Sequence, residues 1–126
     1  MFTTVFLWIT AIGWIGYGLY CLFVPSTLTT FAGLSPTTLT AEVEIRAMYG
    51  GLQTAVGVLA LIGALHPRRS EGVLLTLSCI YLGLCLTRSS SALLLGDASA
   101  YTLGAAGFEG LSALISIWLL RGSRSA

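Results

Sequence analysis

Charged residues are scarce in this chain, and lysine is absent altogether. Only 9% of its 126 residues are charged, against about 25% in a typical soluble domain. The formal net charge of +1 offers no basic surface on which nucleic acid could be held. We therefore predict that nucleic acid is not a partner and that lipid is the main surrounding of the chain.

The residues that commonly build redox and metal sites are also few. The three cysteines, Cys21, Cys79 and Cys85, lie inside apolar stretches and form no CxxC pair, so neither a disulfide framework nor a thiol relay is indicated. The one histidine, His66, stands alone in its loop. We expect the cysteines to be packing residues, and we predict no metal site and no evident cofactor.

Apolar residues make up 56% of the sequence and fall into four blocks. The blocks cover residues 4–24, 41–65, 72–95 and 99–120, and each is about 30 Å or more in length at about 1.5 Å per helical residue. That length crosses the hydrocarbon of a bilayer. The pattern predicts an all-α integral membrane four-helix bundle that forms a single domain over residues 1–126.

The longest connection, residues 25–40, has room for further structure. Its apolar spacing and its Gly33 stop predict a short interfacial helix between the first and second spans. Thr40 is expected to be the N-cap of the second span. Glu42 and Glu44 would then lie in the first helical turn, where the helix dipole favours carboxylates.

Four arginines predict the orientation of the chain in the membrane. Arg68 and Arg69 lie between the second and third spans, and Arg121 and Arg124 follow the fourth. In a four-span chain these segments share a side, and short cytoplasmic loops retain basic residues. We therefore expect a multi-pass protein of the bacterial inner membrane with both termini in the cytoplasm.

Two charges fall well inside the spans, where a charge without a partner costs several kcal/mol. Arg88 lies about 10 Å before the end of the third span, and Glu109 lies about 15 Å into the fourth. These similar depths predict an ion pair between neighbouring antiparallel helices. The second span begins near the same level, so the candidate ligand or partner site comprises Glu44, Arg46, Tyr49, Gln53, Arg88 and Glu109.

Small and hydroxyl-bearing residues repeat along one face of each of these spans. Such residues let helix backbones approach closely in lipid. The predicted packing positions are Gly50, Gly57, Ala105 and Ser112. The charged cluster then has two readings: it fixes the register of the helices, or it recognises a bound molecule.

The run AEVEIRAMYGGLQTAVGVLAL, residues 41–61, resembles the signature of a bacterial family of small four-span membrane proteins catalogued as domain of unknown function 4345. Pro25, Arg88 and Glu109 correspond to further marks of that family. Such proteins are also distantly similar to the DoxX-type membrane group. The resemblance implies a four-helix bundle with inward-facing Glu44, Arg46, Arg88 and Glu109, and it carries no assigned activity.

Three functions are compatible with these features. The first is a non-catalytic accessory subunit or a binder of a lipophilic molecule, with membrane lipids, other membrane subunits or a second copy as partners. The second is a membrane enzyme that acts on a lipid-like or quinone-like substrate, with Glu109 or Glu44 as acid or base and Arg88 or Arg46 stabilising an anion. The third is a small transporter or channel.

Overall fold

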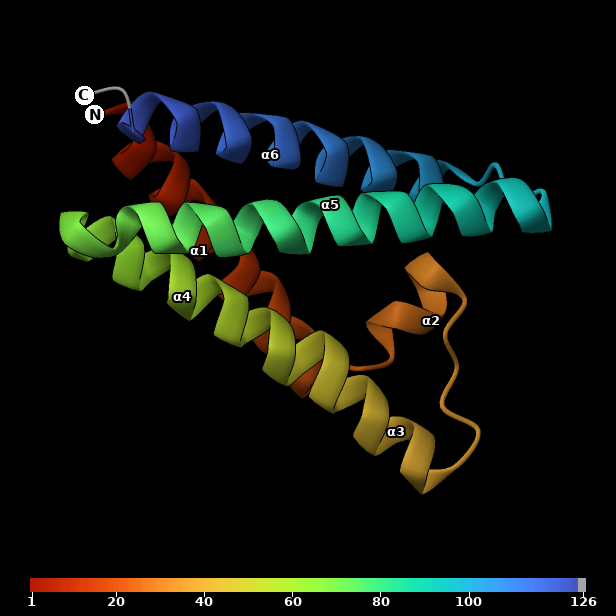
Figure 1. The fold of residues 1–126 in the computed structure, drawn as a ribbon. Helices are drawn as coiled ribbons and strands as arrows, with labels where there is room; N and C mark the ends of the chain where they lie inside the picture. The colour runs from red at the N-terminus through yellow and green to blue at the C-terminus, as the bar shows by residue number, and fades with distance from the viewer. Residues whose placement is uncertain (125–126) are drawn as a thin grey trace. The chain divides into compact units, whose positions relative to one another are not determined.

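The computed structural model describes the backbone of residues 1–124 and the side chains of residues 1–122. Within that range the chain is helical and contains no strand. The elements, in chain order, are α1 Phe2–Phe23, α2 Thr27–Ala32, α3 Leu39–Ile45, the π-helix η1 Arg46–Leu52, α4 Gln53–Leu65, the 3₁₀ turn η2 Pro67–Arg69, α5 Ser70–Leu95 and α6 Ala100–Arg124 (Figure 1).

Four helical segments are long and apolar enough to cross a membrane. They cover Phe2–Phe23, Leu39–Leu65, Pro67–Leu95 and Ala100–Gly122. The predicted all-α class with four long apolar helices is confirmed. The first three segments begin two to five residues before the predicted bounds, and the fourth begins one residue after its predicted start. The third begins earliest relative to its prediction because η2 runs into α5.

The first compact unit, residues 1–67, is held together by α1 lying along η1 and α4 (Figure 1). Glycines make this contact close. A Cβ added at Gly57 would lie 2.6 Å from the backbone nitrogen of Ile15, and one added at Gly50 would lie 2.8 Å from the Cβ of Leu22. Real Cβ atoms do not approach so closely, so both positions require glycine. The structure thus places these two predicted packing residues at a helix contact.

The connection between α1 and α3 contains the expected short helix, α2, which ends at Gly33 with a φ of 66°. The predicted N-cap at Thr40 is wrong. Thr38 caps α3 instead, and its hydroxyl accepts a hydrogen bond from the backbone N–H of Ala41 at 3.1 Å. Because α3 therefore begins at Leu39, Thr40 lies inside the helix and Glu42 is the acidic residue of its first turn.

The second compact unit, which begins at Arg68, pairs α5 with α6 (Figure 1). The two helices meet through small and aromatic side chains. The Sγ of Cys85 donates to the carbonyl of Ala106 at 3.6 Å, and the rings of Tyr81 and Phe108 meet edge to face at 6.0 Å. Ser112 is buried in α6. The further predicted packing residue of this helix, Ala105, is half-buried.

Candidate functional site

Arg88 of α5 and Glu109 of α6 form an ion pair. The Nε–H of Arg88 donates to Oε1 and Oε2 of Glu109 at 3.1 and 3.0 Å, and Nη2 donates to Oε1 at 2.7 Å. Arg88 lies about 10 Å before the end of α5, and Glu109 about 14 Å after the start of α6. A short antiparallel turn between the two helices brings these depths together, so the pair follows from the register of the hairpin.

The two partners differ in their exposure. The side chain of Glu109 is 5% exposed, whereas that of Arg88 is 29% exposed. A buried carboxylate needs donors to replace its water shell, and the guanidinium supplies them. Since Arg88 covers Glu109 and keeps part of its own surface open, the positive partner is the one that a bound molecule can reach.

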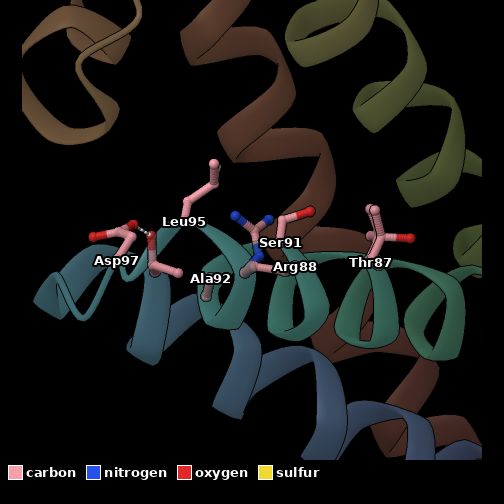
Figure 2. A pocket seen from close by; sticks show the side chains of 8 residues that line it. Thr87, Arg88, Ser91, Ala92, Leu95 and Asp97 are labelled. Carbon is pink, nitrogen blue, oxygen red and sulfur yellow. Dashed lines mark hydrogen bonds between the residues drawn. The ribbon is translucent and has the colours of Figure 1, made fainter.

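That open surface faces a pocket of about 310 Å³. Figure 2 shows Arg88, Ser91 and Leu95 rising from the same side of α5, as their three- to four-residue spacing requires. Hydroxyls and aliphatic side chains therefore surround the guanidinium. The lining residues are Leu84, Thr87, Arg88, Ser91, Ala92, Leu95, Asp97 and Thr102.

Asp97 lies at the rim of the pocket, in the turn between α5 and α6. Its carboxylate accepts hydrogen bonds from the hydroxyl of Thr102 at 2.6 Å and from the backbone N–H of Ser99 at 2.9 Å. These bonds, that of Thr102 first, lower the pKa of the Asp97 carboxyl. The side chain is therefore ionised at neutral pH, and it organises the start of α6 at the same time.

Arg46 has a different role from Arg88. Its Nε and Nη2 donate to Oε1 of Glu42 at 3.1 and 2.8 Å, and its Nη1 donates to the carbonyl of Leu22 in the last turn of α1. The last carbonyls of a helix have no partner inside that helix. Arg46 thus joins α3 to the end of α1, and these contacts account for its charge without a ligand.

The remaining predicted site residues lie in the first unit, and they do not line the pocket that Arg88 faces. Glu44 is exposed and makes no hydrogen bond or ion pair within the described residues. Tyr49 is half-buried within η1. The Oε1 of Gln53 is buried and has no hydrogen-bond partner among the described residues. That all six predicted residues meet at one site stays a prediction.

Sequence reasoning missed part of the pocket. The candidate site predicted from the sequence does not include Thr87, Asp97 or Thr102, which line the pocket. The spacing of Leu84, Arg88, Ser91 and Leu95 follows one helix face, so it could have indicated the lining of α5. Thr102 lies three residues after Ser99, a typical spacing for hydrogen bonds at a helix start.

No group of three His, Cys, Asp or Glu side chains within the described part of the chain lies close enough to hold a metal ion. The three cysteines carry free thiols. The pocket lining itself offers a guanidinium, a carboxylate and several hydroxyl groups.

A family model matches residues 2–120 of the chain, and its description is domain of unknown function, DUF4345. The chain belongs to the DUF4345 family. No curated protein and no solved structure matches this DUF4345 protein. The match covers almost the whole sequence. It therefore includes Arg88 and Glu109, two of the residues on which the family resemblance rests. The likeness to the DoxX-type group and a bacterial source stay predictions.

Proposed function

We propose that this small polytopic membrane protein is a non-catalytic binder of a lipophilic molecule, and that the pocket at the α5–α6 turn receives the polar head of that molecule. The observation that carries the proposal is the placement of the ion pair. Its enclosed carboxylate, on Glu109, is not among the residues that line the pocket, while its guanidinium, on Arg88, belongs to a lining residue. A pair that served only helix register would not need a pocket beside its cation.

The composition of the pocket supports an amphipathic ligand. Arg88, Thr87 and Ser91 offer hydrogen bonds, whereas Leu84 and Leu95 offer apolar walls. Ligand pockets combine a mostly apolar lining with a few convergent polar groups, and about 300 Å³ is at the small end of their usual range. That volume suits a head group, with the hydrocarbon of the ligand left in the bilayer.

Binding is better supported than catalysis or transport. A general acid or base must reach the reacting atom, but both carboxylate oxygens of Glu109 hold the Nε–H of Arg88. The same pairing argues against Glu109 as a carrier of ions across the membrane. An accessory role toward another membrane subunit, or toward a second copy, fits a protein of this kind and is part of the proposal.

The experiment compares two neighbouring serines of α5. Both serines are exposed, but Ser91 lines the pocket and Ser90 does not. We expect the wild-type protein, purified in mild detergent, to retain about one molecule of a lipophilic compound per chain by mass spectrometry of the extract. Ser91→Trp should lose that compound, and Ser90→Trp should keep it. Equal retention by both variants would refute binding in this pocket.

We also propose an inner-membrane location with cytoplasmic termini, on the arginine distribution. Arg68 and Arg69 lie just before α5, and Arg121 lies near the end of α6; the side chain of Arg124 falls outside the described residues. A C-terminal alkaline phosphatase, which is active only outside the cytoplasm, should be silent, and a C-terminal green fluorescent protein should fluoresce. The reverse result would overturn the topology.

A further inference from the structure

We infer that the ligand of the α5–α6 pocket is an uncharged lipophile with a hydrogen-bond-accepting oxygen, and that Glu109 is the residue that rejects anions. The inference rests on the proposed function, because it names the ligand class of the same pocket. An exposed arginine in a membrane protein suggests an anionic ligand at first sight. The charges around Arg88 argue for the opposite.

Among the described residues that line the pocket, Arg88 is the one cation and Asp97 the one anion. The Oε1 of Glu109 lies 2.7 Å from the Nη2 of Arg88. The formal charge of the three together is therefore −1. An anionic head group would lose its water shell, meet the field of Asp97 and compete with a carboxylate that is already seated on the guanidinium. Burying a charge without a compensating partner is costly.

The hydrogen-bonding groups of the pocket favour an oxygen acceptor. A guanidinium has donors and no acceptor, and a hydroxyl can both donate and accept. Arg88, Thr87 and Ser91 together therefore suit a carbonyl, ester, ether or hydroxyl oxygen. A cationic head group would be attracted by Asp97 at the rim, but the pocket lining offers it no second carboxylate, because Glu109 already binds the guanidinium of Arg88.

The depth of the pocket fits an elongated molecule. Arg88 lies about 10 Å before the end of α5 and Asp97 follows that end, and the aliphatic side chains of Ala92 and Leu95 line the pocket between these two residues. A molecule whose oxygen reaches Arg88 can also contact these aliphatic side chains. An acyl chain with an uncharged oxygen-bearing head can do so at a low desolvation cost.

The test uses one cross-linking probe and two competitors of the same chain length, a neutral methyl ester and the corresponding carboxylate. A methyl ester of a diazirine-bearing fatty acid is cross-linked to the detergent-purified protein, and labelling of residues 84–102 is mapped by mass spectrometry. Unlabelled methyl dodecanoate and dodecanoate then compete at pH 9, where a carboxylate is ionised. We expect the ester to compete at an at least tenfold lower concentration than the carboxylate, a difference that corresponds to about 1.4 kcal/mol.

Glu109→Gln provides the decisive variant. It keeps the shape of the side chain and removes the charge that compensates Arg88, so the order of the two competitors should reverse. Glu71→Gln is the matched control, because Glu71 is an exposed carboxylate at the far end of α5. That control should keep the wild-type order. A reversed order in Glu71→Gln, or an unchanged order in a folded Glu109→Gln, would overturn the role of Glu109.

The wild-type comparison is decisive whichever variants fold. If dodecanoate competes as well as methyl dodecanoate, the inference of an uncharged ligand is wrong and the binding pocket stands. If neither compound reduces the labelling of residues 84–102, the proposed binding function itself is refuted, and the inference falls with it. Tighter competition by the ester supports both.

Discussion

Removal of one partner of the Arg88–Glu109 pair should destabilise the protein more than removal of both. Arg88→Met leaves a carboxylate that is 5% exposed without its three hydrogen bonds, and breaking a buried pair in this way costs about 3–5 kcal/mol. Glu109→Leu leaves a cation that is 29% exposed and can turn toward the pocket. We expect that variant to lose less, about 1.5–3 kcal/mol, the range for hydrogen bonds to charged groups.

The double variant Arg88→Met with Glu109→Leu leaves no charge unpaired. Replacement of a buried ion pair by apolar residues of similar size is often neutral or stabilising, so the double variant should unfold within about 1 kcal/mol of the wild type. The assay is equilibrium unfolding in mixed micelles of dodecylmaltoside and sodium dodecyl sulfate, followed by circular dichroism. A double variant that loses the sum of the two single losses would show that the residues do not act as a pair.

The Glu42–Arg46 pair provides a matched control for this cycle. Its side chains are 38% and 40% exposed and lie four residues apart on one helix. Exposed pairs at this spacing contribute about 0.3–0.5 kcal/mol. Arg46→Met should also lose the contact with Leu22, but the coupling energy with Glu42→Leu should stay below about 1 kcal/mol. A large coupling there would show that the assay does not distinguish buried from exposed pairs.

Three further predictions concern the helices themselves. Gly57→Ala should lower the free energy of unfolding by about 1–3 kcal/mol, because the added Cβ would meet the backbone of α1. Gly13 has open space around it, so Gly13→Ala should be neutral or slightly stabilising in the same unfolding assay. Thr38→Ala should cost about 1 kcal/mol through the lost cap, whereas Thr40→Ala should change stability by less than about 0.5 kcal/mol. In the folded protein the pKa of Asp97 lies below its ordinary value of about 3.9. The ionised side chain therefore stabilises the protein above about pH 3.9, and this stabilisation is lost as the pH falls through the lowered pKa. Asp97→Asn should lack this loss when unfolding is measured at acid pH.

The helices and the ion pair follow from simple rules that can be applied to the sequence. Apolar blocks of membrane-spanning length predict the four long helices, and the depths of Arg88 and Glu109 predict their meeting once the short turn makes α5 and α6 antiparallel. Such a turn leaves few alternative registers. Sequence reasoning succeeds here because the cost of an unpaired charge in lipid exceeds the weaker preferences that compete with it.

Features are harder to predict where neighbouring residues have similar preferences for the same structural position. Thr38 and Thr40 are both good N-caps, and the choice between them depends on where α3 meets the preceding turn. The π-helix at Arg46–Leu52 also has no simple sequence rule, although such turns often occur at functional sites. Its Gly50 carbonyl accepts a hydrogen bond from the hydroxyl of Thr54, a compensation that only the three-dimensional structure reveals.

The contacts of Arg46 and Arg88 show which of the two arginines is available to a ligand. The cluster predicted from the sequence contains two arginines and two carboxylates, which is more than one structural ion pair requires, and such a surplus favours recognition of a bound molecule. Arg46 is now accounted for by Glu42 and the end of α1, so the surplus no longer carries the argument. Arg88 carries it instead, because its charge is compensated and yet its guanidinium lines a pocket. A compensated cation beside hydroxyls selects a ligand by hydrogen bonding rather than by charge, and the ester and carboxylate probes measure that distinction.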